Sequence, residues 1–232
     1  MKYTLCLDSS NIDLTVGLIQ GSNVLASTSY EAWQCQSEHM IPEIDALFKK
    51  YDVKNEDIEN IIVSIGPGSY TGIRIALTIA KTMAVALPSV SIYLVSSLQV
   101  LKNGDKPSIC LINARSNRSY FAVYQGNECL QKDQIKTNDE VLAFIKEHPD
   151  YCLCGDARYL SLDGYKSDIT KEMLNILPSL EKEEYPLSIK PIYMISSIDL
   201  INANLTVDKY KNEEKRKREE IEKKFEVEEK KK

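Results

Sequence analysis

One stretch of the sequence, Gly66-Pro67-Gly68-Ser69-Tyr70-Thr71-Gly72-Ile73-Arg74-Ile75-Ala76-Leu77, separates a strand-like run from a helix-like segment. The run before it, residues 61–65, is apolar and rich in β-branched side chains, and the segment after it keeps a helical period to about Leu87. Glycine adopts backbone angles that other residues resist, so the stretch predicts a strand, a tight turn and a helix. Ser69 or Thr71 is expected to cap this helix, because a hydroxyl oxygen accepts a hydrogen bond from an early backbone N–H.

The glycine turn is open to two interpretations, a structural turn or a cradle for a phosphate group. A helix N-terminus attracts anions because its first N–H groups are unpaired. However, Pro67 removes one such donor, and the sequence has no Gly-Lys-Ser/Thr ending of a nucleotide P-loop and no Gly-x-Ser-x-Gly of a nucleophile elbow. The structural turn is therefore the favoured interpretation.

The helix after the turn is apolar over an unusually wide arc of about 200°, where a helix that only covers a sheet needs about half of that. Its polar side chains gather on one narrow side: Arg74, Thr78, Lys81 and Thr82. Gly72, Ala76 and Ala80 form a smooth strip, and small residues four apart let another helix approach closely. Either the helix is buried between a sheet and a neighbouring helix, or one of its flanks docks a partner chain.

Composition sets further bounds. The 232 residues, 43% of them hydrophobic, have room for one large domain or two small ones with a substantial core. The net charge of −5 argues against a strongly basic nucleic-acid binder. No apolar run reaches about 18 residues and no signal-peptide pattern is present, so a cytoplasmic protein without membrane contact is expected. The six cysteines mostly lie in apolar runs and lack zinc-site spacing.

From its N-terminus onward, the sequence predicts two halves with a similar order of elements. A few residues of the first half recur in the second at nearly the same spacing. In the first half we expect strands 3–7, 14–20, 24–30, 61–65 and 91–95 and helices 37–51 and 71–87. A turn-rich boundary at 102–107 precedes strands 108–114, 119–125, 128–131 and 151–154 and a helix 137–147. The predicted divisions are a first lobe over 1–101, a second lobe over 102–205 and a charged helical or disordered tail over 206–232.

Local signals mark where two helices begin. Ser37 is expected to cap the helix 37–51, and Pro42 fits best in its first turn, where a missing N–H costs nothing. Thr137 with Glu140 three residues later has the spacing of a capping box. After Gly155 the sequence no longer shows a regular strand or helix periodicity.

The glycine stretch closely resembles the signature of the bacterial TsaB family, also called YeaZ. Weaker matches are Leu7-Asp8-Ser9-Ser10, Ser37-Glu38 followed by Pro42, Ser96-Ser97-Leu98, Asn113-Ala114-Arg115 and Pro191-Ile192-Tyr193. The resemblance covers most of residues 1–195 and leaves out the charged tail. Gln36 stands where the family usually has histidine and Asn113 where it usually has aspartate, and neither change damages a scaffold role.

The resemblance implies an α/β, actin-like fold of the sugar kinase and actin ATPase type, with two related lobes that each hold a mixed sheet and flanking helices. It implies a non-catalytic scaffold that binds and activates a TsaD-type catalytic subunit, a paralogue, for threonylcarbamoylation of the adenosine next to the anticodon in tRNAs. A TsaE-type ATPase is a further implied partner. A homodimer of the chain alone is left open, tRNA contact is expected to be indirect or weak, and no cofactor is expected.

The family's heterodimer is similar to a helix bundle made from the first-lobe helices of each subunit, here 37–51 and 71–87. The expected partner interface is therefore Met40, Ile44, Leu47, Gly72, Ile73, Ala76, Leu77, Ala80, Met83 and Ala84. The signature loop comprises Gly66, Pro67, Gly68, Ser69, Thr71, Gly72 and Arg74. No catalytic, cofactor-binding or metal-binding residue is assigned.

A phosphotransferase or ATPase acting alone is the alternative function. That fold class places carboxylates from both lobes around Mg²⁺ and phosphate, because phosphoryl transfer depends on charge neutralisation and positioning. Asp8 is present in the first lobe, but the matching turn Asn113-Ala114-Arg115 has no acid, and Gly155-Asp156 lacks the paired glycines expected beside an adenosine. Asp8 is therefore interpreted as a turn residue.

A metallopeptidase is a third interpretation. The two histidines, His39 and His148, lie more than 100 residues apart, and no His-Glu-x-x-His motif occurs. His39 and Glu43 are four residues apart on one helix but are expected on its polar side, beside Lys50. Metal binding is therefore disfavoured.

The last 25 residues, 208–232, contain eleven Lys or Arg and nine Asp or Glu, with few apolar side chains. Such a segment is a solvated single helix or a disordered tail rather than part of a core. Its run Lys215-Arg216-Lys217-Arg218 leaves a nucleic-acid contact open, although the interspersed acids weaken the field.

Deleting residues 208–232 should leave the melting temperature nearly unchanged, because the tail has almost no apolar surface to bury. Differential scanning calorimetry of the full and shortened chains measures this. A fall of more than about 5 °C, roughly 1 kcal/mol or more, would show that the tail packs on the body.

Overall fold

The structure, a computed structural model, describes residues 2–194, and the tail predicted over 206–232 lies outside the described residues. The first sheet consists of β1 (Tyr3–Asp8), β2 (Asp13–Gln20), β3 (Asn23–Glu31), β4 (Ile58–Ser64) and β5 (Ser91–Val95). The second consists of β6 (Ser108–Arg115), β7 (Arg118–Gln125), β8 (Glu128–Thr137) and β9 (Cys152–Gly155). The α-helices are α1 (Gln36–Lys50), α2 (Tyr70–Ala86), α3 (Asn138–Glu147) and α4 (Ile169–Ile176).

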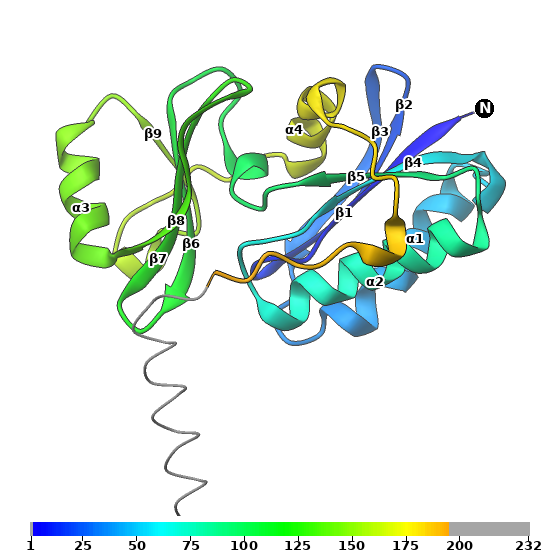
Figure 1. Cartoon of the computed structure of the whole chain (residues 1–232), viewed down its shortest axis with the longest axis horizontal. Helices are drawn as coiled ribbons and strands as arrows, with labels where there is room; N and C mark the ends of the chain where they lie inside the picture. Colours follow the sequence, from blue (N-terminus) through cyan, green and yellow to red (C-terminus); the bar gives the residue numbers. More distant parts are fainter. Residues whose placement is uncertain (1, 195–232) are drawn as a thin grey trace, which may run out of the picture. The chain divides into compact units, whose positions relative to one another are not determined.

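The two sheets repeat one plan (Figure 1). The first has the strand order β3-β2-β1-β4-β5 and the second β8-β7-β6-β9. In each, an antiparallel meander leads through a helix to a strand that pairs in parallel with the first strand of the meander, β4 with β1 and β9 with β6. The predicted α/β organisation with two related mixed sheets is therefore confirmed.

The helices divide the faces of the sheets among themselves. In Figure 1, α1 and α2 lie along one face of the first sheet, and α3 lies on the outer face of the second. Strand residues alternate between these faces: Leu5 and Leu7 pack with α1 and α2, whereas Cys6 points to the opposite side. Both faces of β1 are buried, which explains why apolar residues follow one another at Leu5, Cys6 and Leu7.

Helix α4 occupies the opposite face of the first sheet and was missed by the sequence analysis, which found the region after Gly155 irregular. Asp168 caps it by accepting a hydrogen bond from the backbone N–H of Lys171 at 3.1 Å. Ile169, Met173 and Ile176 enter a core that also contains residues of both sheets, including Cys6 and Cys110. The helix has only eight residues, so this packing, rather than intrinsic propensity, must stabilise it.

A buried ion pair ties α4 to the segment that joins the lobes. The Lys102 ammonium contacts the Glu172 carboxylate, and both side chains are nearly inaccessible to water. The second oxygen of Glu172 accepts the backbone N–H of Gly104 at 3.2 Å. Because each buried charge has a partner, removing either side chain would leave the other uncompensated.

After α4 the chain returns to the first lobe, as two hydrogen bonds show. The backbone N–H of Glu183 donates to Ile92 at 2.9 Å, and that of Ile192 donates to Ile65 at 2.7 Å. Lys81 of α2 donates to the carbonyl of Ile189 at 2.6 Å. In Figure 1 this orange segment runs beside α2.

The predicted caps at the starts of α3 and α1 have different outcomes. Thr137 and Glu140 form the predicted capping box at α3, with both reciprocal bonds in place. At α1 the predicted Ser37 cap is wrong: the helix begins at Gln36, and Cys35 before it provides no side-chain cap. Pro42 therefore lies inside α1, on an exposed face where water can reach the carbonyl left unpaired by its missing N–H.

Substitution of Gly72 tests how closely α2 must approach the turn after β1. A Cβ added there would overlap the Ser9 carbonyl oxygen, so Gly72→Val should lower the free energy of unfolding by about 2–3 kcal/mol, the usual cost of overpacking. The control is Gly21→Asn, at a hairpin with open space and a positive φ that asparagine tolerates. Urea unfolding measures both, and equal stability losses would contradict the proposed close contact.

Candidate functional site

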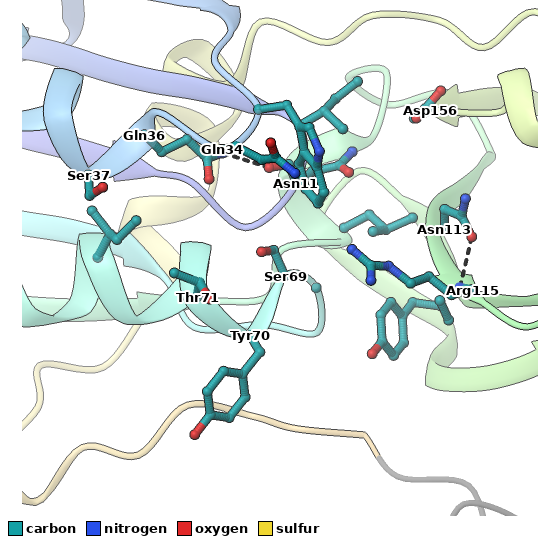
Figure 2. A pocket seen from close by; sticks show the side chains of 17 residues that line it. Asn11, Gln34, Gln36, Ser37, Ser69, Tyr70, Thr71, Asn113, Arg115 and Asp156 are labelled. Atoms are coloured by element: carbon teal, nitrogen blue, oxygen red, sulfur yellow. Dashed lines mark hydrogen bonds between the residues drawn. The ribbon is translucent and has the colours of Figure 1, made fainter.

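A cleft of about 690 Å³ opens between the two lobes. Its walls come from the turn after β1, the residues that lead into α1, the signature loop with the start of α2, and the end of β6 (Figure 2). The labelled side chains in this view are Asn11, Gln34, Gln36, Ser37, Ser69, Tyr70, Thr71, Asn113, Arg115 and Asp156. The cleft thus lies beyond the carboxyl ends of β1 and β6, the central strands of both sheets, where open α/β sheets usually bind ligands.

The signature loop forms one wall and packs tightly on the turn after β1. Its glycines stand where the backbone passes close to other segments: a Cβ at Gly68 would overlap the Ser10 carbonyl, and one at Gly66 would overlap the carbonyl of Ile192. Gly66 and Gly68 also have φ values of +112° and +158°. These contacts explain the glycines by steric fit.

The donors of the signature loop are largely paired within the chain. Ser69 caps α2 as predicted, accepting the Gly72 N–H at 3.2 Å. The Ser69 N–H donates to the Ser10 carbonyl at 2.6 Å, and the Gly66 N–H donates to the Ser97 hydroxyl at 3.0 Å. These bonds hold the loop against the turn after β1 and against Ser97, as expected of a structural turn.

Arg74, the last residue of the signature loop, fastens the C-terminal segment to α2. Its Nε donates to the Tyr193 hydroxyl at 2.8 Å, and its guanidinium lies 4.5 Å from the centre of the Tyr70 ring. Tyr70 and Tyr193 stack with ring centroids 4.8 Å apart. The arginine thus has a structural role outside the cleft centre.

Asp8, the first-lobe carboxylate, is only 4% exposed. Its Oδ1 accepts the hydroxyl of Ser10 at 2.8 Å and the backbone N–H of Ser10 at 3.4 Å, the arrangement of a turn-stabilising aspartate. Burial raises the pKa of this carboxyl, and the Ser64 and Ser10 hydroxyls offset part of the rise. The geometry supports the interpretation of Asp8 as a turn residue.

The second-lobe turn presents Arg115 to the cleft instead of an acid. The β6–β7 pairing shifts register between Asn113 and Arg115, and Arg115 has a φ of +61°. A bulge of this kind redirects a side chain, and here the Asn113 side chain supports it by accepting the Arg115 backbone N–H at 2.8 Å. The Arg115 guanidinium then lies 5.8 Å from the centre of the Trp33 ring.

Acidic residues at the edge of the cleft are held by ion pairs between and within the lobes. Lys166 contacts Asp13 at 3.0 Å, and Arg158 contacts Glu31 at 3.6 Å and Asp156 at 2.9 Å. Asp13 and Glu31 belong to the first lobe, whereas the other three follow β9. These exposed pairs fix alignment more than they add stability.

The structure accounts for the His39 and Glu43 pair. The Tyr30 hydroxyl donates to Glu43 at 3.0 Å and lies 3.1 Å from His39 Nδ1, so both side chains interact with β3. Across residues 2–194 no group of three or more His, Cys, Asp or Glu is arranged to hold a metal ion. Within the same range no helix has the length and hydropathy needed to cross a membrane.

Eight of the ten residues expected to contact a partner are buried inside the chain itself. They are Met40, Ile44, Leu47, Gly72, Ile73, Ala76, Leu77 and Ala80; Met83 and Ala84 are half-buried. Helix α2 packs on the sheet, on α1 and on the C-terminal segment, which together explain its wide apolar arc. The smooth strip faces the chain's own core, and the partner interface stays a prediction.

Sequence reasoning missed three exposed features near these elements. Ile41 of α1, next to the buried Met40, is 54% exposed. Trp33 faces Arg115 across the cleft and carries no motif of its own, and Arg115 entered only as part of the Asn113-Ala114-Arg115 match. The one signal available was that a tryptophan stands in the polar, turn-like stretch before α1.

The relatives found by comparison with known proteins agree with one another. A family model described as TsaD, tRNA N6-adenosine threonylcarbamoyltransferase, matches residues 30–158, more than half of the chain. The tRNA threonylcarbamoyladenosine biosynthesis protein TsaB of Bacillus subtilis is 32% identical over 143 residues, covering 60% of this chain and 62% of that protein. An uncharacterized protein of Mycoplasma genitalium is 25% identical over 195 residues, covering 83% of this chain and 95% of that protein.

A solved structure shows the same fold. YeaZ from Pseudomonas aeruginosa superposes with a TM-score of 0.71 at 20% identity, covering 84% of this chain and 100% of that one. The two lobes therefore define an α/β protein of the actin-like class. Together with the sequence matches, this places the chain in a family: it belongs to the TsaB (YeaZ) family.

The buried carboxyl of Asp8 predicts a specific pH dependence. Its raised pKa means that the folded chain still binds a proton where the unfolded chain has lost it, so the free energy of unfolding should decrease as pH rises from the ordinary carboxyl value of 3.8 toward the native one. Asp8→Asn keeps an oxygen acceptor for Ser10 and should remove this decrease. Urea unfolding at a series of pH values measures the difference between the two proteins.

The control is Asp163→Asn, which removes an exposed charge and should leave the pH dependence unchanged. If Asp8→Asn kept the full pH dependence and was less stable near neutral pH, the buried carboxylate would not be its source.

Proposed function

We propose that this chain is a non-catalytic subunit that binds and activates a TsaD-type catalytic subunit in the threonylcarbamoylation of the adenosine next to the anticodon in tRNAs. One observation carries the proposal: the turn of the second lobe presents Arg115 where a phosphate-handling enzyme of this fold would need an acid. The names of the TsaB relatives support the pathway.

The electrostatics of the cleft support a role without turnover. Phosphoryl-transfer sites hold Mg²⁺ with accessible carboxylates. Here Asp8 is buried and paired with Ser10, and Asp156 is paired with Arg158. An ATPase acting alone therefore has little support from the described residues.

A docking surface on α1 and α2 is part of the proposal, but on their outer side. Helical spacing puts Ile41 on the same side of α1 as Ser37, and Ser37 lines the cleft together with Ile75 of α2. Ile75 and Ile79 are partly exposed, and Thr78 and Thr82 flank them. This outer side is a small apolar surface with a polar edge, which suits a reversible helix–helix contact.

The remaining partners follow from the same proposal. A TsaE-type ATPase would join the assembly of the two paralogues, and the chain alone would form a homodimer through the same outer helix surface when the catalytic subunit is missing. Contact with tRNA would be indirect or weak, because the net charge of the chain is −5.

Reconstitution with the TsaD-type protein of the same cell tests the proposal. The chain alone should neither hydrolyse ATP nor transfer threonylcarbamoyl. The mixture should co-elute in gel filtration and, when a threonylcarbamoyl donor is supplied, modify tRNA. Ile41→Glu should weaken the complex by at least about tenfold, because a charge would be desolvated in the contact. The variant should stay folded, since Ile41 is 54% exposed.

Leu142→Glu is the matched control, because it adds the same charge to an apolar residue that is 40% exposed on α3 of the second lobe. Circular dichroism checks both folds. Robust Mg²⁺-dependent turnover by the chain alone, or a catalytic subunit fully active without it, would refute the scaffold role. Equal binding by both variants would refute the docking surface.

A further inference from the structure

Four side chains form a polar cluster where α1 begins, on the side of this helix that faces β3. Cys35 stands directly before α1, His39 and Glu43 follow at intervals of four residues, and Tyr30 belongs to β3. Residues four apart lie on the same side of a helix, so the three residues of the α1 region can meet Tyr30 together. All four side chains are half-buried, and none of them lines the cleft.

The hydrogen bonds of this cluster fix where its protons are. The Tyr30 hydroxyl donates to Glu43 at 3.0 Å, and burial together with Glu43 raises the pKa of Tyr30, so the tyrosine keeps its proton near neutral pH. A hydroxyl has one proton to donate, so the Tyr30 oxygen accepts from His39 Nδ1, which lies 3.1 Å away. Nδ1 of His39 therefore carries a proton. A second proton on the other ring nitrogen makes an imidazolium that Tyr30 links to the Glu43 carboxylate.

The sulfur of Cys35 lies beside this histidine. Its Sγ is 3.9 Å from Nδ1 of His39, and as a thiol it donates to the Ala32 carbonyl at 3.4 Å. An imidazolium at this distance favours the thiolate, and so does the N-terminus of a helix, whose unpaired N–H groups carry partial positive charge. Glu38 in the first turn of α1 opposes this effect, but it is exposed, so water and salt screen its charge.

The other five cysteines are less accessible to a reagent or less easily ionised. Three are fully buried: Cys6, Cys110 and Cys154. Burial raises the pKa of the half-buried Cys152, and burial followed by the charge of Asp133 raises the pKa of the exposed Cys129. Cys35 combines partial exposure with a neighbouring base, which is the setting of a reactive thiol rather than of a core cysteine.

We propose that Cys35 is a site of reversible disulfide exchange with low-molecular-weight disulfides, its thiolate stabilised by His39 and by the start of α1. In this step the thiol proton moves through water to the second ring nitrogen of His39. The sulfur then attacks one sulfur of the small disulfide, a mixed disulfide forms as the old S–S bond breaks, and the departing thiolate takes up the proton from His39. Cys35 is oxidised and one half of the small disulfide is reduced to a thiol. The proposal does not depend on the proposed function.

The full chain is incubated with hydroxyethyl disulfide at neutral pH, and peptide mapping by mass spectrometry follows each cysteine over time. This reagent is small and uncharged, so surface charge does not attract it to one cysteine over another. We expect Cys35 to be modified at least about tenfold faster than Cys129, although Cys129 is the more exposed of the two, because the rate depends on the thiolate fraction. Dithiothreitol should reverse the modification.

Variants of the histidine test its charge. His39→Gln keeps a group that can hydrogen-bond to Tyr30 but removes the cation, and it should slow the modification of Cys35 at least about fivefold. His39→Lys restores a cation and should recover part of the rate, which a merely structural role of the histidine does not predict. His148→Gln, at the other histidine of the chain, is the matched control and should change the rate less than about twofold. Circular dichroism checks each fold, and Cys129 is the internal control for the reagent.

Modification of Cys129 as fast as Cys35 in the unaltered chain would overturn the proposal. An unchanged rate at Cys35 in His39→Gln would overturn it too, since the thiolate would then not depend on the imidazolium. If His39→Lys reacted as slowly as His39→Gln, the histidine would act through packing alone, and the proposal would fall as well.

Discussion

The contact of α2 with the turn after β1 is the constraint on which the rest of the first lobe depends. The Ser9 hydroxyl donates to the carbonyl of Gly72 at 2.7 Å, and the Ser10 carbonyl accepts the N–H of Ser69. These bonds require the backbones to touch, which is why residue 72 has no side chain. The contact fixes the start of α2 against the central strand and thereby sets the wall of the cleft.

Burial of α2 on three sides changes how its composition should be understood. A wide apolar arc indicates several neighbours, and these can all belong to the same chain. Here the sheet, α1 and the C-terminal segment provide them, with Lys81 and Arg74 holding that segment in place. The proposed docking surface is therefore confined to the outer side of the helix pair, which is more polar than the predicted interface residues.

The strands, the helices with a regular spacing of apolar residues, and the Ser69 cap could be predicted from the sequence. Each depends on the periodicity of neighbouring residues or on local hydrogen bonding. Helix α4 could not, since its eight residues are stabilised by a core drawn from both sheets. The cleft pair of Trp33 and Arg115 could not either, because it depends on a bulge and on left-handed backbone angles that non-glycine residues adopt without a sequence signature. Periodicity identifies an apolar face of a helix, but it does not identify the neighbour that covers it.

The shared core around α4 has a consequence for motion. Domain closure requires a hinge of a few residues and an interface that can slide or separate. Here Ile169 and Met173 pack with residues of both sheets, Lys102 and Glu172 are buried together beside the linker, and the chain passes between the lobes again before it reaches Ile189. Opening the lobes would expose apolar residues of this shared core. Such opening is therefore costly for the described lobes, which favours molecules that fit the cleft as it stands.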